Sequence, residues 1–252
     1  MSDRAYRFGE DWGDFLTALR VAKFNPSQPR DGDGKWTDTG GGRSDAFMAH
    51  VDYGQRDAYG AATDAARRNV AEESGLAVSR YTGGGYLRLN ESLMDGVELD
   101  EGQQREVELL DGAVVDLPAP LTVARGVSMR VRGAMPEGGA LGAVSDMAAE
   151  RWPVGSTVDM GGNYQSSSMY YEPTLDRTGL RQSGYGQTTA GVVFRIRNVR
   201  RGAPAGPWSQ FDDEAEVILP RHQRIRITGI STETIETYIG THERVIIDAE
   251  AT

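Results

Sequence analysis

Two glutamates near the end of the chain, Glu214 and Glu216, stand in the run EAEVILP. Side chains of a strand alternate between faces, so both carboxylates are predicted to point the same way, with Cα atoms about 7 Å apart. That separation suits two carboxylates that hold different reacting groups, one steadying a cation and the other taking a proton, better than a dyad sharing one proton. The alternative is a solvent-facing edge strand above buried Val217 and Leu219.

The segment before these glutamates, GAPAGPWSQFDDE, is rich in proline and glycine and contains Trp208 and Phe211. Loops are normally polar, so two bulky aromatic residues beside paired carboxylates predict a surface that faces a substrate or a partner protein. The alternative is that Trp208 and Phe211 fold back onto the core.

Three consecutive serines, 166–168, follow an aromatic residue in the run NYQSSSM, which begins at Asn163. Hydroxyl groups in series can orient a neighbouring carboxylate or a ligand, although a serine run taken alone is typical of a turn or a helix cap. No histidine and aspartate stand at a spacing that would activate a serine, so a nucleophilic role has little support.

Arg125 lies in the otherwise apolar run LTVARGV and is followed by Gly126. A guanidinium placed where the pattern predicts burial needs an anionic partner, and its planar fork fits phosphate oxygens. The alternative is a salt bridge to a buried acid. Arg125 is therefore a candidate ligand of a phosphate group.

Composition narrows the remaining classes of function. The chain has no cysteine and three histidines, which excludes disulfides and thiolate sites and argues against a zinc site, so we expect no metal. A net charge of -10 disfavours binding to nucleic acid. No apolar run reaches the roughly 20 residues that span a bilayer, so we expect no membrane association and a cytoplasmic protein.

The elements that must position these residues divide into two groups. Helical patterns cover 59–73, 86–93 and 102–110, whereas β-like runs dominate beyond residue 121. Helices first and strands afterwards predict an α+β fold. A short helix over 11–23 and a breaker-rich linker over 25–43 predict an N-terminal extension, 1–45, before a main domain, 46–252. The β-like runs are LTVARGV, GSTVDM, AGVVFRIRNV, AEVILP, RIRITGI and RVIIDAE.

Arginine, serines and glutamates in this order resemble the landmarks of the toxin-like mono-ADP-ribosyltransferases, which modify proteins with ADP-ribose from NAD. ARGV resembles the family's first core strand, so the resemblance assigns the NAD-contacting arginine to Arg125. YQSSS resembles the family's aromatic-x-Ser-Thr-Ser motif and gives Ser166 and Ser168, with Ser167 in place of the family's threonine. EAEVILP resembles the Glu-x-Glu motif, which makes Glu216 the catalytic glutamate and Glu214 the upstream one.

The resemblance implies a split core of two small β-sheets with NAD in the cleft between them, and helices on the N-terminal side. RYTGGGYLRLNESLM, 80–94, looks like the helix-turn-helix stretch before the family's first core strand. A target-recognition loop would cover 203–213 and include Trp208 and Phe211, and Glu214 implies modification of arginine in a host target protein. The implied NAD-binding residues are Arg125, Gly126, Asn163, Ser166, Ser168 and Glu216.

Two further segments give weaker matches. After the serines, family members carry an aromatic residue and an arginine on the phosphate side of NAD, for which Tyr170, Tyr171, Arg177 and Arg181 are candidates without a clear match. FNPSQPRDGDGKW, 24–36, resembles a segment of phage head-morphogenesis proteins. This likeness implies a phage product that acts in the host cytoplasm and is carried in a virion.

Other functions remain open at this point. The chain could be a virion structural or interaction protein with a degenerate transferase domain, which would bind NAD poorly. It could be an NAD glycohydrolase that passes ADP-ribose to water. Paired carboxylates also serve carbohydrate hydrolases, but there the two acids flank the bond rather than stand two residues apart on one strand.

Overall fold

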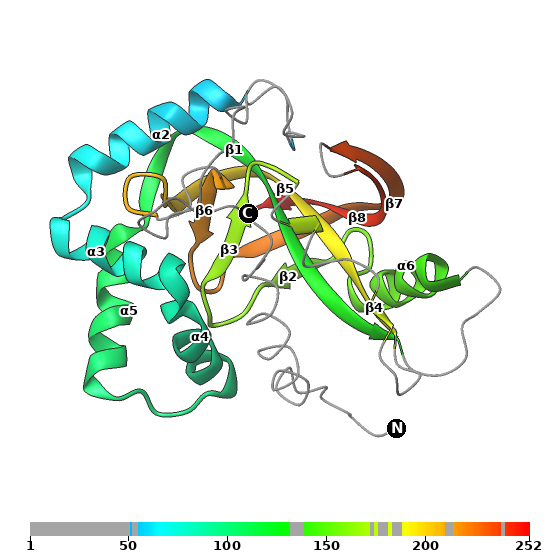
Figure 1. Cartoon of the computed structure of the whole chain (residues 1–252), viewed down its shortest axis with the longest axis horizontal. Helices are drawn as coiled ribbons and strands as arrows, with labels where there is room; N and C mark the ends of the chain where they lie inside the picture. Colours follow the sequence, from blue (N-terminus) through cyan, green and yellow to red (C-terminus); the bar gives the residue numbers. More distant parts are fainter. Residues whose placement is uncertain are drawn as a thin grey trace, which may run out of the picture.

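The computed structural model of the protein places one group of helices on one side of the strands and α6 (Gly139–Arg151) on the other (Figure 1). The described residues are 51, 55–131, 139–171, 174–175, 181–182, 188–209, 214–237 and 240–252. The expected N-terminal extension, 1–45, with its predicted helix and linker, lies outside them.

Helices come first in the described part of the chain and gather on one side of the strands, at the left of Figure 1. Asp100 caps the last of these helices, α5, through a capping box: its carboxylate accepts from the Gln103 N–H at 2.8 Å, and the Gln103 side chain accepts from the Asp100 N–H. The group consists of α2 (Arg56–Asn69), α3 (Glu72–Arg80), the π-helical turn η2 (Tyr81–Gly85), α4 (Tyr86–Asp95) and α5 (Glu101–Ala113).

The turn η2 and the end of α4 depend on glycine. Gly84 has φ of 122°, a conformation that side chains with a Cβ rarely adopt, and it marks the kink between α3 and α4. Gly96 ends α4 in the left-handed region, with φ of 63°, as a C-terminal helix cap. The predicted helix-turn-helix over 80–94 is therefore present as the end of α3, the π-helical turn η2 and α4.

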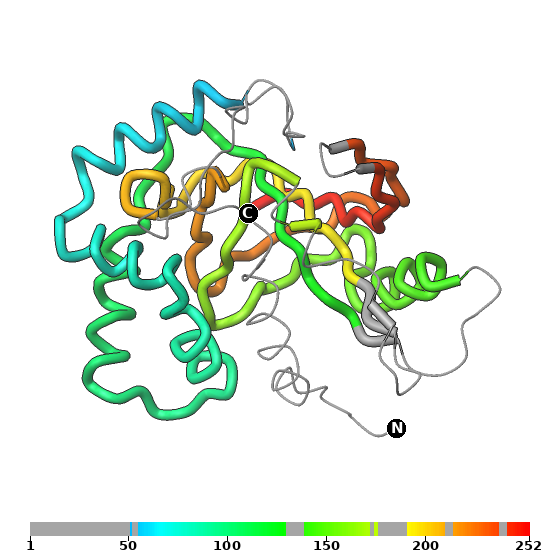
Figure 2. Tube along the Cα trace, viewed as in Figure 1, coloured from blue at the N-terminus to red at the C-terminus, as the bar shows by residue number. Residues whose placement is uncertain are grey.

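Two long strands, β1 (Val115–Val131) and β5 (Thr188–Pro204), form the spine of the sheet and pair antiparallel from Val115 to Val131 (Figure 2). Beside β5 lie β8 (Gly240–Ala251, parallel), then β7 (Arg224–Thr237) and β2 (Thr157–Asp159). The short strands β3 (Gln165–Ser168) and β6 (Glu216–Leu219) bridge the middle of β1, at Ala124, to the end of β5, at Ala203 and Pro204. The remaining elements are β4 (Arg181–Gln182), paired with β5, and α6 (Gly139–Arg151).

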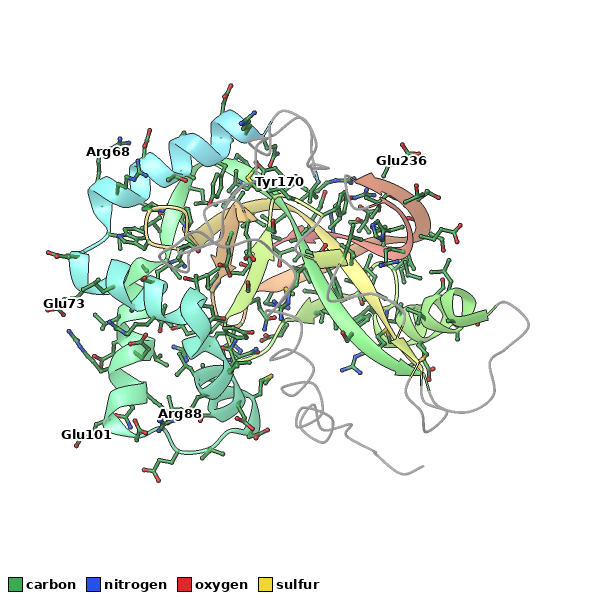
Figure 3. The ribbon with its side chains drawn as sticks, in the orientation of Figure 1. Arg68, Glu73, Arg88, Glu101, Tyr170 and Glu236 are labelled. Atoms are coloured by element: carbon green, nitrogen blue, oxygen red, sulfur yellow. The ribbon has the colours of Figure 1, made fainter. Side chains whose placement is uncertain are left out.

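The α+β fold is confirmed. The described strands are hydrogen-bonded into one continuous sheet, in which the two small sheets that the resemblance implied are not separate. One apolar cluster lies between the sheet and α6 and includes Phe194, Ile247 and Trp152. A second lies between α3–α5 and the β3–β6 bridge and includes Tyr81, Tyr164 and Ile218. Arg68, Glu73, Arg88 and Glu101 point away from the helices, whereas Tyr170 lies among the strands (Figure 3).

The six predicted β runs coincide with strands β1, β2, β5, β6, β7 and β8, but three expectations need correction. The helical pattern over 59–73 is two helices, because the chain is extended at Val70, with ψ of 130°. The helix α6 was not predicted, because its run of small residues, GALGAVSDMAAER, has a weak apolar period. The serine run is a strand rather than a turn or a cap.

Candidate active site

The serine run and Glu216 meet on paired strands. In the antiparallel register of β3 and β6, Ser168 stands opposite Glu216 and Ser166 opposite Ile218. Residues two apart on a strand share a face, so Ser166, Ser168 and Glu216 project on the same side. The Ser166 hydroxyl donates a short hydrogen bond to the Glu216 carboxylate, across the diagonal of this ladder. The strand pair therefore brings together two of the predicted catalytic residues.

Each of the three serines has a different hydrogen-bond acceptor. Ser166 serves the Glu216 side chain, Ser167 donates to the Val217 carbonyl at 2.6 Å, and Ser168 donates to the Glu214 carbonyl at 2.5 Å. The Ser168 oxygen in turn accepts from the Tyr170 N–H at 2.9 Å. Glu216 is 6% exposed, so the carboxylate that accepts from Ser166 lies inside the protein.

Arg125 reaches the same serine from strand β1. Its Nη1 donates to the Ser166 carbonyl at 2.6 Å, and the strands themselves touch where Ala124 pairs with Ser168. The side chain is half-buried, as the apolar pattern around it predicted. Arg125, Ser166 and Glu216, which lie far apart in sequence, are thus joined through consecutive hydrogen bonds.

Glu214 lies outside the strand that was predicted to carry it. Strand β6 begins at Glu216, and Ala215 has φ of 43°, which breaks the extended conformation between the two glutamates. The alternation that placed both carboxylates on one face therefore does not reach Glu214. The half-buried Glu214 is fixed through its backbone, by the hydrogen bond from Ser168.

A tyrosine and an asparagine of the helices hold the start of β3. The Asn90 amide donates to the Tyr164 carbonyl at 3.1 Å and accepts from its N–H at 3.2 Å, and the Tyr81 hydroxyl donates to that carbonyl at 3.2 Å. Burial raises the pKa of Tyr81 above its ordinary value, and the negative charge of Glu216 raises it further. Tyr81 therefore stays protonated next to the site. Sequence reasoning missed this pair.

Other predicted ligands of NAD lie around the same strands. Asn163 is buried in the turn before β3, where its Oδ1 accepts from Gln165 Nε2 at 2.8 Å. Gly126 follows Arg125 in β1 and pairs with Val193. Of the phosphate-side candidates, Tyr170 and Tyr171 are buried, Arg181 contributes its backbone to β4, and Arg177 lies outside the described residues.

Trp208 is partly buried and packs against the helical cluster that contains Tyr81 and Ile218. Its indole covers Gly75 of α3: a Cβ at that glycine would lie 2.3 Å from the indole Nε1. This placement corresponds to the alternative in which Trp208 folds back onto the core. Phe211, the other predicted recognition residue, lies outside the described residues.

A second polar cluster, which the sequence analysis missed, surrounds Arg195 of β5. The guanidinium donates to both oxygens of Asp248, at 2.7 and 2.9 Å, and to both oxygens of Glu233, at 2.8 and 3.0 Å. The Tyr171 hydroxyl lies 3.3 Å from its Nη1. The Asp248 hydrogen bonds raise the pKa of Arg195. The signal that selected Arg125, a guanidinium in an apolar run, was also present in AGVVFRIRNV.

The described part of the chain offers no group of three or more histidine and acidic side chains that could hold a metal ion. Within that part, no helix is both long and apolar enough to cross a membrane.

Comparisons with known proteins agree with this geometry. The family model described as ADP-ribosyltransferase exoenzyme matches residues 56–252, which include every described element of the site. No curated protein matches the chain in sequence.

Among solved structures, the chain is similar to Plx2a, an ADP-ribosyltransferase toxin from Paenibacillus larvae, with 16% identity and a TM-score of 0.56 over 81% of this chain and 100% of that one. It is similar to C2-I, the enzymatic component of the C2 toxin from Clostridium botulinum, with 20% identity and a TM-score of 0.56 over 81% of this chain and 47% of that one. It thus spans about half of C2-I.

A third similar structure is C3stau2 from S. aureus with NAD, with 13% identity and a TM-score of 0.57 over 81% of this chain and 99% of that one. At these identities the similarity concerns the fold, whereas the family match covers most of the sequence. The chain, with its arginine on β1, its serines on β3 and its glutamate at the start of β6, belongs to the ADP-ribosyltransferase exoenzyme family of NAD-dependent transferases.

Proposed function

We propose that this protein transfers a single ADP-ribose unit from NAD to an arginine side chain of a host protein. The observation that carries the proposal is that Arg125 and Glu216 meet at one serine: Ser166 donates to the buried Glu216 carboxylate, and Arg125 donates to the backbone carbonyl of Ser166. They are the arginine, the first serine and the catalytic glutamate that the resemblance assigned, in that order along the chain.

Glu216 supplies negative charge where the reaction develops positive charge. Cleavage of the bond between nicotinamide and ribose leaves the ribose with oxocarbenium character, and nicotinamide departs with the bonding electrons. A hydrogen bond from a ribose hydroxyl to the Glu216 carboxylate strengthens as that charge develops, which stabilises the transition state more than the ground state. Ser166 keeps the carboxylate in one orientation for this role.

Arg125 is suited to the phosphate groups of NAD because its planar guanidinium carries a permanent positive charge and several donors. Ser168 ends β3, Asn163 lies in the turn before that strand, and Gly126 follows Arg125 within β1; these three residues are proposed to line the NAD site. The solved structure of C3stau2 with NAD supports NAD as the substrate of this fold.

Glu214 is the proposed contact for the acceptor. A guanidinium nitrogen of the acceptor forms a bond to the ribose carbon that nicotinamide leaves, and the proton that this nitrogen loses passes to Glu214. Free guanidinium has a pKa above about 12, so the proton must leave as the new bond forms rather than before it. Phe211 is proposed to contact the surface of the target protein.

The first experiment incubates the purified protein with labelled NAD and a bacterial lysate, with Glu216→Ala in parallel. We expect the wild type to release nicotinamide and to label protein, and we expect both signals to disappear in the variant. Label that mild hydroxylamine removes supports arginine as the acceptor. Release of nicotinamide without any protein label would favour a glycohydrolase, and no release would favour a degenerate domain.

The acceptor role of Glu214 has its own test. Glu214→Ala is expected to keep nicotinamide release from NAD within a few-fold of the wild type, because the variant leaves the Glu216 carboxylate and Ser166 in place. Transfer to poly-L-arginine is expected to fall by roughly a hundredfold, since the incoming guanidinium loses its base. Equal losses of both activities would contradict a role confined to the acceptor.

We also propose that the protein acts in the host cytoplasm after delivery in a phage virion. The support is the resemblance of residues 24–36 to phage head-morphogenesis proteins, and this segment lies outside the described residues. Detection of the protein by antibody in purified virions tests the proposal, and its absence from virions contradicts it.

A further inference from the structure

Residues 205–215 connect β5 to β6, the strand that begins with Glu216. The described parts of this segment are 205–209 at the start and 214–215 at the end. The start is a tight turn, in which the N–H groups of Trp208 and Ser209 both donate to the Ala205 carbonyl, at 2.9 and 2.8 Å. This turn carries Trp208 directly toward α3.

The indole of Trp208 fills a site that exists only because residue 75 is glycine. A Cβ at Gly75 would lie 2.3 Å from Nε1 and 2.5 Å from Cε2 of Trp208, distances at which one group has to move. Gly75 lies within the buried face of helix α3. Glycine in the middle of a helix is less favourable than alanine, so its presence here is explained by the close approach of the indole.

A second contact ties the two ends of the segment together. The Tyr59 hydroxyl of α2 donates to the Glu216 carbonyl at 3.2 Å and accepts from the Gly206 N–H. The Ala205 N–H donates to the same Glu216 carbonyl at 2.9 Å. Tyr59 therefore bridges Gly206, the second residue of the segment, and Glu216, the residue that follows it.

We propose that Trp208, docked on Gly75, and Tyr59 are positioning residues that fix the start of segment 205–215 on the helices and so set where the acceptor protein meets Glu214. The inference rests on the proposed transferase function. It assigns Trp208 to the inside of the segment, in place of direct contact with the target.

The two contacts should affect different steps. The Glu216 carboxylate is oriented by the β3–β6 ladder and by Ser166. Among the described hydrogen bonds, none joins the Trp208 side chain to either strand. Loss of the Trp208 dock therefore moves the segment while it leaves the NAD-cleaving residues in place. Tyr59 contacts the Glu216 backbone itself, so loss of its hydroxyl should affect both cleavage and transfer.

The test uses Gly75→Ala, which adds one methyl group beneath the indole, and Gly60→Ala as the matched control. Gly60 is an exposed helical glycine with nothing within 4 Å of a built Cβ, so alanine is tolerated there. Gly75→Ala is expected to lower transfer to poly-L-arginine roughly tenfold, with nicotinamide release in the absence of acceptor nearly unchanged. Gly60→Ala should change neither activity.

A double-mutant cycle shows whether the effect passes through the indole. Trp208→Ala should lower transfer to a similar extent, and adding Gly75→Ala to it should cost little more, because the group that the methyl displaces is gone. If the fold-losses of transfer in the two single variants multiply in the double variant, the docking role is overturned. Tyr59→Phe should lower nicotinamide release as well as transfer, and an unchanged release would remove Tyr59 from the proposal.

Fluorescence separates this inference from the proposed function. The emission attributable to Trp208, taken as the difference from Trp208→Phe, should shift to longer wavelength in Gly75→Ala and not in Gly60→Ala. An unshifted emission overturns the docking whatever the activities are. A wild-type protein that does not cleave NAD refutes the proposed function and leaves the fluorescence result to decide the docking.

Discussion

Two polar clusters on the same sheet hold carboxylates inside the protein by different means. At the β3–β6 pair, the buried Glu216 accepts a hydrogen bond from Ser166, a neutral hydroxyl. Around β5, Asp248 and Glu233 share the guanidinium of Arg195, with four donor contacts between 2.7 and 3.0 Å. The second cluster pairs its carboxylates with a guanidinium, whereas in the first the Ser166 hydroxyl sets the orientation of the carboxylate.

This difference in the partners of the carboxylates indicates a catalytic role for the first cluster and a structural role for the second. A carboxylate whose charge is matched by a bidentate guanidinium gains little from a second cation, so the Arg195 cluster serves to join β5, β7 and β8. A carboxylate that a hydroxyl holds in one orientation is directed at a cation that develops during the reaction. Substitutions in the two clusters should therefore change different observables, activity in the first and stability in the second.

The largest effect is expected for Glu216→Gln. The amide keeps the size of the side chain and an oxygen that accepts from Ser166, but it carries no charge to stabilise the developing oxocarbenium. Nicotinamide release and transfer should both fall by at least about a thousandfold. Thermal unfolding should stay close to that of the wild type. Full activity in this variant would show that Glu216 takes no part in the chemical step. The contrast between the Glu216 and Arg195 clusters would then fail.

Arg195→Met is expected to give the opposite pattern. The variant leaves Asp248 and Glu233 together without their shared cation. The free energy of unfolding should fall by about 2–4 kcal/mol, which is less than for a fully buried pair because Glu233 is one third exposed. Urea unfolding measures it. Arg197→Met is the control, since Arg197 is 52% exposed and 3.4 Å from Asp248. Similar losses in both variants would contradict a structural role specific to Arg195.

Neighbouring serines sharpen the comparison within the site. Ser166→Ala removes the donor to Glu216 and should lower kcat for NAD cleavage roughly tenfold, with a small change in KM. Ser167→Ala removes a donor to the Val217 carbonyl on the other side of the strand. It should cost about 1 kcal/mol of unfolding free energy and leave kcat unchanged. A lower kcat in Ser167→Ala alone would reverse the assignment.

Much of this fold could be predicted from sequence because its strands are rich in β-branched residues. The runs around Val123, Val192 and Ile246 have buried apolar positions in regular order, and each predicted a strand. Arg125 could be found because a guanidinium interrupts such a run. The family resemblance then supplied the order of arginine, serines and glutamates. This order cannot be seen in the local pattern around any one of these residues.

Other features depend on contacts that a local pattern does not encode. Three serines have no apolar period, so β3 becomes a strand only because β1 and β6 lie on either side of it. The positive φ of Ala215, which removes Glu214 from the strand, is unusual for alanine. The partners of Arg195 lie 38 and 53 residues away along the chain, on strands whose pairing had to be known first.

The smallest effect is expected at Tyr164, which directly precedes the strand of the serines, β3. Its hydroxyl lies 2.6 Å from Asp111 Oδ1 and 2.9 Å from the Val107 carbonyl. Tyr164→Phe removes these contacts, but Arg221 still holds the Asp111 carboxylate at 2.5 Å, so no charge is left without a partner. The loss should be about 1 kcal/mol in urea unfolding.

Activity is the informative readout for Tyr164→Phe. The backbone of residue 164 stays fixed by Asn90, which contacts its N–H and its carbonyl, and this backbone leads directly into Ser166. NAD cleavage by Tyr164→Phe should therefore stay within about twofold of the wild type. A tenfold loss would mean that the helices control the orientation of Glu216 through the tyrosine hydroxyl, and the site would then extend beyond the β3–β6 pair to Asp111 and Arg221.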